Sequence, residues 1–179
     1  VMSPVDNGST HDSGSAPQLQ AKYVWSGDSA KVWIGGKHQK FEAMAGSGLD
    51  DFSMSGAELG ASFTAGKFDM LANVQSGKGL GILSDGDQLD TKSTNWLVQG
   101  TFAVTDALKL GANYGISRNR DETPATAGLE SNANLTAGAY YKLTSSITLA
   151  IEVGQTRSEA FDGTTVRMNG ASFGGIIFF

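Results

Sequence analysis

Cysteine is absent from this chain of 179 residues, which excludes both a disulfide scaffold and a thiolate metal site. Proline is scarce, and its 3 residues fall in predicted loops or at the start of a predicted strand, where a missing N–H costs nothing. No apolar run approaches the length of about 18 residues that indicates a transmembrane helix. The formal charge of −5, with no run of basic residues, argues against a nucleic-acid partner.

Aromatic residues, in contrast, recur at nearly constant intervals of 38 or 39 residues, at Trp25, Phe63, Phe102 and Tyr141. Each stands just before a short polar turn, with the sequences SGDS, TAGK, VTDA and LTSS. A second segment of alternating apolar residues and then a long polar stretch follow each turn. This order is typical of a repeated β-hairpin, in which two strands share a tight turn and a long loop leads to the next hairpin.

Apolar residues alternate strictly with polar or small residues inside these segments. In the stretch ALKLGANYGIS, Leu108, Leu110 and Tyr114 fall on one face, whereas Lys109 and Asn113 fall on the other. A helix cannot place these residues in that way, so the period of two indicates strands. The pattern predicts nine strands, at 17–25, 30–40, 55–64, 67–76, 94–104, 107–118, 132–143, 146–158 and 167–179. The longer polar connections are predicted at 41–54, 77–93, 119–131 and 159–166.

The alternation fits either a soluble β-sandwich or a membrane barrel whose apolar face meets lipid. Most predicted strands reach the roughly 9–11 residues that cross a bilayer, whereas soluble strands more often have about 5–6. Short turns on one rim, long loops on the other and aromatic rings beside the turns are typical of outer-membrane barrels. We therefore predict an all-β fold, an antiparallel transmembrane β-barrel in the outer membrane of a Gram-negative bacterium. Solubility without detergent would instead indicate the sandwich.

The chain closes on GASFGGIIFF, without a polar tail. On this last predicted strand Phe173, Ile177 and Phe179 share one face, and Phe179 falls at the rim of the short turns. We interpret the terminal ring as part of a lipid-facing girdle, which then consists of Trp25, Phe63, Phe102, Tyr141 and Phe179.

Three stretches resemble the Gram-negative general porin family: TNWLVQGTFAVTDALKLGANYGIS, SNANLTAGAYYKLTSSITLAIEVGQTRSE and the terminal GASFGGIIFF. The first two are similar to consecutive porin hairpins and the third to the closing strand with its terminal phenylalanine. The resemblance extends over about 55–179 and is weaker before that. Many outer-membrane proteins share the terminal phenylalanine, so it is specific for the compartment, whereas the hairpins are more specific for porins.

The resemblance implies a trimeric, 16-stranded barrel with a water-filled pore for passive diffusion of ions and small hydrophilic solutes. It also implies that Phe173, Ile177 and Phe179 carry the recognition signal for the membrane insertion machinery. Nine strands are too few for such a barrel, and bacterial single-chain barrels have an even number. We therefore interpret 17–179 as the C-terminal strands of a porin and 1–16 as part of an external loop. The seven N-terminal strands and the family's inward-folded constriction loop would come from the rest of the protein or another chain. One strand more or fewer would instead make the chain a small complete barrel.

Charged and polar residues fall on the strand faces opposite the girdle and are predicted to line the pore. They are Lys22, Lys31, Lys37, Glu58, Asp69, Lys109, Asn113, Lys142 and Glu152. These residues either bias ion passage or only keep the interior wet and pair with one another. Most acidic residues fall in the loops, where a negative mouth would favour cations, bind divalent ions shared with anionic lipid, or simply be polar surface.

No cofactor, metal site or enzymatic activity is expected. The stretch SDGDQLD matches a calcium loop only at Asp85 and Asp87, and it lacks that loop's distal glutamate. The two histidines, His11 and His38, have no serine or carboxylate at a sequence spacing that would indicate a catalytic site. The expected partners are outer-membrane lipid and lipopolysaccharide, small solutes and ions, and two further copies in a homotrimer. The alternative function is that of a small, filled barrel acting as a structural anchor or adhesin without transport.

Overall fold

The computed structural model describes residues 11–12, 17–82, 85–87, 89–120 and 128–179, and the regular elements within them are all β-strands. A search of these residues finds no helix suited to crossing a membrane. Neighbouring strands pair antiparallel. The strands are β1 (His11–Asp12), β2 (Leu19–Ser26), β3 (Ala30–Ala43), β4 (Phe52–Ala65), β5 (Phe68–Lys78), β6 (Lys92–Ala103), β7 (Leu108–Asn119), β8 (Leu129–Lys142), β9 (Ile147–Ala160) and β10 (Thr165–Ile177).

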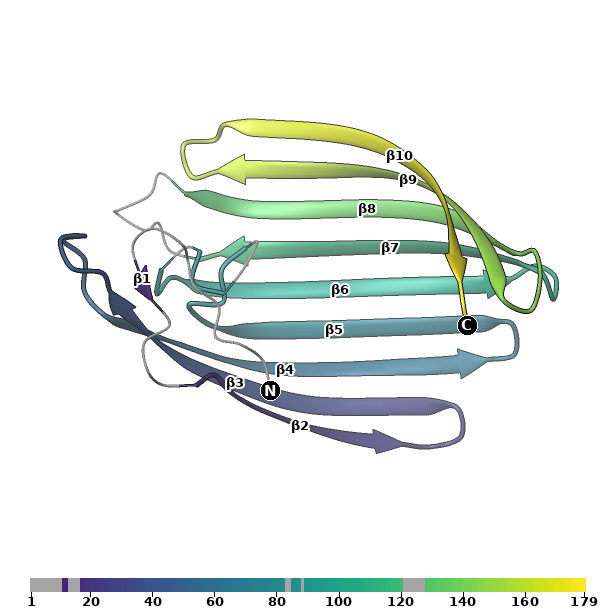
Figure 1. The fold of residues 1–179 in the computed structure, drawn as a ribbon, viewed down its shortest axis with the longest axis horizontal. Helices are drawn as coiled ribbons and strands as arrows, with labels where there is room; N and C mark the ends of the chain where they lie inside the picture. The colour runs from purple at the N-terminus through teal and green to yellow at the C-terminus, as the bar shows by residue number, and fades with distance from the viewer. Residues whose placement is uncertain (1–10, 13–16, 83–84, 88, 121–127) are drawn as a thin grey trace.

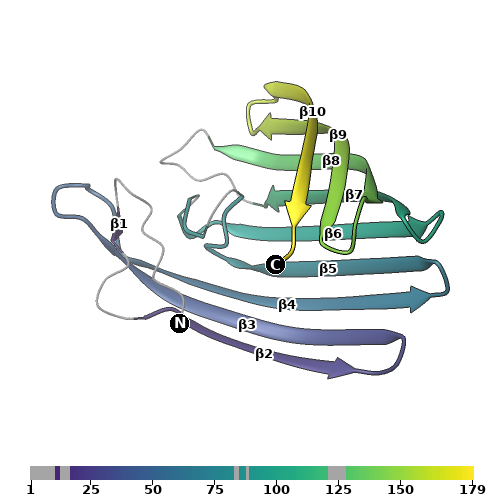
Figure 2. The same cartoon turned by 45° about the vertical axis from the view of Figure 1, so that its right-hand side comes forward.

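The long strands form one sheet in sequence order, from β2 through β3 to β10. The short β1 pairs with the C-terminal end of β3, where His11 lies opposite Ala43. Figure 1 and Figure 2 show that the sheet is strongly curved and that β2 and β10 lie at its opposite edges. Among the described residues no pairing joins β2 to β10. The chain thus forms an open section of an antiparallel barrel wall, as the predicted fold class requires.

The connections differ in length between the two rims of the sheet, as the sequence predicts. At one rim β4 and β5 are joined through Gly66, whose φ of 59° is favoured by glycine. The turns after β6 and β8 are stabilised in the same way, by a threonine hydroxyl that accepts two backbone hydrogen bonds. Thr105 accepts them from the N–H groups of Ala107 and Leu108, and Thr144 accepts them from those of Ser146 and Ile147. The rim with these tight turns is called the short-turn rim below.

Most strands extend further toward the opposite rim than the alternation predicts. Residues predicted as loop but found in strands include 41–43, 52–54, 77–78, 92–93, 129–131 and 159–160. The prediction failed there because hydropathy stops alternating once both faces of a strand meet polar surroundings, while backbone pairing continues. At the other end, β10 stops at Ile177, two residues before the predicted end of the last strand.

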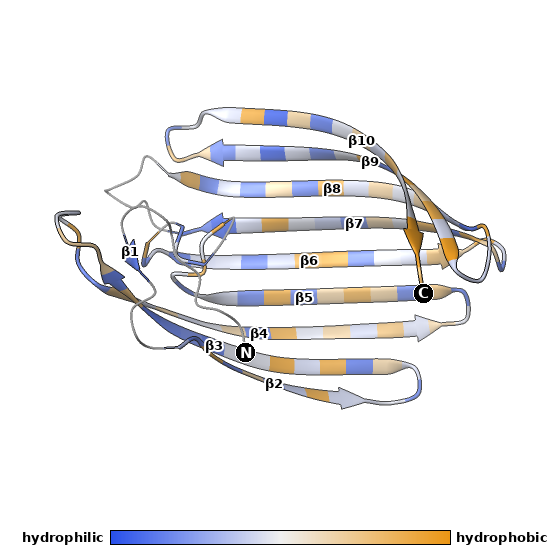
Figure 3. Ribbon diagram, viewed as in Figure 1, coloured by the Kyte–Doolittle hydropathy of each residue, from blue (hydrophilic) through white to orange (hydrophobic). Residues whose placement is uncertain are grey.

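Side chains alternate between a concave face, toward which the sheet curves, and a convex face. The described residues have a small buried apolar cluster, formed by Phe41, Met54 and Leu80 near the rim of the longer connections. Large apolar residues are otherwise mostly exposed, such as Phe68 and Val74 of β5. Figure 3 shows the alternation of polar and apolar positions along the strands. A soluble sandwich would bury its apolar face, so this distribution argues against that alternative.

Candidate functional site on the concave face

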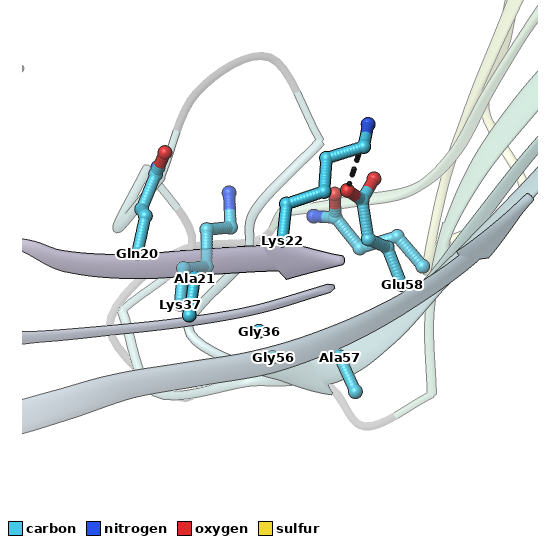
Figure 4. A pocket seen from close by; sticks show the side chains of 9 residues that line it. Gln20, Ala21, Lys22, Gly36, Lys37, Gly56, Ala57 and Glu58 are labelled. Atoms are coloured by element: carbon cyan, nitrogen blue, oxygen red, sulfur yellow. Dashed lines mark ion pairs between the residues drawn. The ribbon is translucent and has the colours of Figure 1, made fainter. Parts of the chain in front are cut away.

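An ion pair joins β2 and β4 on the concave face of the sheet. Lys22 Nζ lies 3.2 Å from Glu58 Oε1, and Asn73 donates a hydrogen bond of 3.4 Å to the other carboxylate oxygen. Figure 4 shows the Lys22, Lys37 and Glu58 side chains on the same side of β2–β4. Gly35 lies between the two strands, and a Cβ there would be only 2.8 Å from Glu58 Oε1. Glycine at this position therefore makes room for the ion pair.

The ion pair belongs to a polar row that crosses the sheet perpendicular to the strands. Register places the members side by side, and none of them carries an apolar side chain. Such a row presents hydrogen-bonding groups to whatever fills the concave side. Its members are Lys22, Gly35, Glu58, Gln75, Asn95, Ser117, Asn132 and Ser158.

A second charged group lies closer to the short-turn rim. Lys109 Nζ lies 3.0 Å from Asp69 Oδ2, although the two residues are 40 positions apart in the chain. Thr64 and Thr101 donate hydrogen bonds of 2.9 and 3.2 Å to the same carboxylate. Asp69 is therefore an acceptor shared by three neighbouring strands. The predicted pore-lining residues Asp69 and Lys109 are thus brought together.

Glu152 has a neutral partner in place of a lysine. The Tyr140 hydroxyl donates a hydrogen bond of 2.6 Å to Glu152 Oε1. A Cβ on Gly138 would lie 3.0 Å from both Glu152 Cγ and the Tyr140 hydroxyl oxygen, so the close approach of these side chains needs glycine. Tyr140 was not among the predicted site residues, although its place on the polar face was evident from the alternation.

The described residues of the connection between β5 and β6, at 79–82, 85–87 and 89–91, fold onto the concave face of β3 and β4. Leu80 packs over Gly56 and is only 3% exposed, while Gly86 lies against the ring of Phe41. Lys37 and Gln18 both donate hydrogen bonds to the Asp85 carboxylate. The sequence predicts this segment as one of the long loops, and the family's inward-folded loop was expected elsewhere in the protein. The structure therefore adds an inward-folded connection, with Asp85 as the partner of Lys37.

The remaining predicted pore-lining residues are not joined into a cluster. Lys31 and Lys142 lie near the short-turn rim and make no ion pair with any residue that the structure describes. Asn113 lies on the concave face between Gln99 and Thr136 in the register. Among the described residues, no group of three or more potential ligands could hold a metal ion.

The aromatic residues predicted for the girdle are found on the convex face. Trp25, Phe63 and Tyr141 are exposed near the ends of their strands, and the rings of Phe68 and Phe102 lie 4.6 Å apart. Phe173 and Ile177 share the convex face of β10 and are exposed, and Phe179 follows the strand and is also exposed. Their roles as membrane girdle and insertion signal stay predictions.

Comparison with protein families gives a match to a model described as Gram-negative porin, over residues 2–160. The chain belongs to the Gram-negative porin family. Its place is therefore the outer membrane of a Gram-negative bacterium. The resemblance drawn from the hairpins is confirmed, and the family points to a channel rather than an enzyme. No curated protein matches the sequence of this porin.

Solved structures share the fold of this porin at low sequence identity. The outer membrane channel DcaP of Acinetobacter baumannii has a TM-score of 0.78 at 18% identity, over 92% of this chain and 52% of its own. The anion-selective porin from Comamonas acidovorans has a TM-score of 0.61 at 13% identity, over 90% of this chain and 47% of its own. OmpT of Vibrio cholerae has a TM-score of 0.57 at 16% identity, over 89% of this chain and 64% of its own. The chain thus spans about half the length of the first two.

Proposed function

We propose that this porin forms a water-filled channel for passive diffusion of ions and small hydrophilic solutes, with the concave face as part of the pore lining. The observation that carries the proposal is the division of the two faces. Polar side chains and glycine form a continuous row across the concave face, while most of the large exposed apolar residues of β3 to β9 lie on the convex face. Water can solvate the first face and lipid the second.

The paired charges support a lining that selects only weakly by charge. Lys22, Lys37 and Lys109 each have a carboxylate partner within the described residues, at Glu58, Asp85 and Asp69. Opposite charges held side by side offer a passing ion both attraction and repulsion. The channel's width, narrowed by the connection between β5 and β6, would then matter more for solute passage than the sign of the lining.

Since the sheet is open between β2 and β10, the pore needs further strands. We propose that they come from the rest of the protein, or another chain, and that the assembly is a homotrimer surrounded by outer-membrane lipid and lipopolysaccharide. The small filled barrel proposed as an alternative lacks support, because the described residues bury an apolar cluster only at one rim.

The test is single-channel recording of the native, detergent-extracted assembly in a planar bilayer. We expect large ohmic steps, and closure in threes would support the trimer. A silent bilayer, with insertion verified, would refute the channel. The variant Lys109→Gln should shift the reversal potential in a salt gradient toward cation preference without abolishing the steps. The matched convex-face change Leu110→Gln should not shift it, which separates lining effects from general damage.

A further inference from the structure

Six amide side chains gather toward the middle of the concave face, on the neighbouring strands β5 to β8. They line a depression of about 350 Å³, and none of the described residues that line it is charged. Sites for small molecules have volumes from about 300 Å³ upward, so the depression is large enough to receive a small ligand. The amides, called the amide cluster below, are Asn73, Gln75, Asn95, Asn113, Asn132 and Asn134.

The register of the sheet brings residues of the amide cluster side by side, although they are far apart in the chain. Gln75 lies directly opposite Asn95, and Ser117 lies between Asn95 and Asn132. Because neighbouring strands are about 4.8 Å apart, this row extends over about 14 Å from β5 to β8. The row thus offers amide and hydroxyl groups over a length that suits a solute of two or three sugar rings.

Leu97 provides an apolar surface inside the amide cluster. It lies directly opposite both Asn73 and Gly115, and Gly115 in turn lies opposite Asn134. A Cβ on Gly115 would be only 3.3 Å from Leu97 Cδ1, so glycine keeps the space beside the leucine side chain open. A ligand in the depression would therefore meet an apolar surface beneath it and amide groups around it.

Much of the hydrogen-bonding capacity of the amide cluster is not used within the protein. In the part of the chain that the structure describes, the side chains of Gln75 and Asn113 make no hydrogen bond. Asn134 is held in place, because it accepts a hydrogen bond of 2.8 Å from Thr136 and donates one of 2.9 Å to Thr156. An amide can donate two hydrogen bonds and accept two, so Asn134 keeps one N–H group and one lone pair for a ligand.

The charged side chains of the concave face lie outside the depression. Asn73 donates a hydrogen bond to Glu58, but the charge of that carboxylate is paired with Lys22. Lys109 and Asp69 pair with each other nearer the short-turn rim. A lining that only had to be hydrated could carry charges here as well. Since removing water from a charged group costs more than removing it from an amide, an uncharged patch favours an uncharged ligand.

We propose that the amide cluster is a binding site for uncharged, polyhydroxylated solutes of the saccharide class on their way through the pore. A saccharide ring carries hydroxyl groups at its edge and C–H groups on its faces. The hydroxyl groups both donate and accept hydrogen bonds, as amides do, and the C–H groups can pack on Leu97. Several weak contacts suit a channel, because the solute must also leave. This inference rests on the proposed function, since solute reaches the site only if the concave face lines the pore.

The test is a titration of the native assembly with the uncharged saccharide maltotriose, during single-channel recording in a planar bilayer. We expect interruptions of the open-channel current that saturate with concentration. The amide variant combines Gln75→Ala and Asn113→Ala. Each lost hydrogen bond should weaken binding about fivefold, so the half-saturating concentration should rise about twenty-fivefold. The control variant combines Gln155→Ala and Asn169→Ala, which removes the same side-chain types from the convex face, and should stay within about twofold of the unmodified porin.

Filling the depression gives a second test. Gly115→Val places a side chain against Leu97 and should abolish the interruptions. Gly170→Val adds the same side chain to the concave face of β10, where a Cβ would have no described neighbour within 4 Å, and should leave the interruptions unchanged. Folding of all variants is checked by their shifted mobility on unheated SDS gels.

Three outcomes with a conducting channel would overturn the proposal. Maltotriose could fail to interrupt the current, or the interruptions could persist unchanged in the amide variant and in Gly115→Val. Tighter binding of the anionic aldonic acid made from maltotriose would show that charged groups carry the recognition. A silent bilayer would refute the channel instead, and binding is then measured by saturation-transfer NMR of maltotriose with the detergent-extracted porin. Transfer that is lost in the amide variant would support the site without conduction, and no transfer to maltotriose would overturn it.

Discussion

Leu80 should be the main apolar anchor of the inward-folded connection between β5 and β6. Its side chain is 3% exposed and contacts a cluster with Phe41 and Met54. The cluster lies at the rim of the sheet, where the surroundings can relax, so the low end of the range for Leu→Ala changes applies. The Leu80→Ala variant should therefore lose about 2 kcal/mol of docking free energy. This loss corresponds to about a thirtyfold rise in the undocked population.

The absence of cysteine makes the prediction measurable by thiol labelling. A Met54→Cys reporter places a thiol beneath the connection, at a position that is fully buried. When labelling is slow compared with docking, its rate is proportional to the undocked population. Adding Leu80→Ala to the reporter should raise the rate of methanethiosulfonate modification about thirtyfold. The same change at Leu135, which is exposed on the convex face, should leave the rate unchanged.

A rise of less than about threefold would refute the reasoning, because Leu80 would then contribute almost nothing to docking. In that case the hydrogen bonds from Lys37 and Gln18 to Asp85 would be the principal attachment. The variant Asp85→Asn in the same reporter background would test this second attachment. The conductance of the Leu80→Ala channel gives a further readout, since an undocked connection should widen the passage and increase the current noise.

Three further predictions concern single sites. Asp69→Asn should shift the reversal potential in a salt gradient toward anions, but should leave the free energy of unfolding nearly unchanged, because the Lys109–Asp69 pair is about half exposed. Gly138→Ala should lower the temperature at which the barrel unfolds in SDS by crowding Glu152, and an unchanged temperature would contradict the close approach. Hydrogen bonds from Ala43 N–H and the Lys40 ammonium hold the pKa of the Asp51 carboxyl below its usual value. The contact therefore stabilises the fold fully above the ordinary pKa of aspartate, and this stabilisation is lost as the pH falls through the lowered pKa of Asp51. NMR of the Asp51 carboxyl group can follow this titration.

The sequence was sufficient to predict the strands and the two faces, because both follow from alternation. Leu110 and Lys109 had to fall on opposite faces whatever the barrel's size. Alternation also identified the ion-pair partners Lys109 and Asp69 as sharing a face, but not as touching, because their contact depends on the register between β5, β6 and β7. Register comes from backbone pairing across the whole sheet, and no local pattern expresses it.

The inward-folded connection could not be predicted for a different reason. Leu80 and Ile82 are isolated apolar residues in a glycine-rich stretch, which reads locally as a flexible loop. The partners of Leu80, Phe41 and Met54, were assigned to another loop, since both lie beyond the alternating segments. The only available signal was that each of the two predicted loops, 41–54 and 77–93, contains two large apolar residues named above. This signal indicates a contact only once the structure shows that β3 and β4 extend far enough to place Phe41 and Met54 beside the other segment.

The similar length of the long strands has a consequence for how such barrels can change in evolution. Because each strand from β3 to β10 has 11 to 14 residues, a hairpin carries its own fit to the membrane and does not depend on its neighbours for it. Duplicating or deleting a hairpin would alter the circumference of the barrel but not its thickness. The repeat near 38 or 39 residues in the chain is then the size of a unit of insertion. Pores of different diameter could arise from copy number alone, with the loops left to diverge.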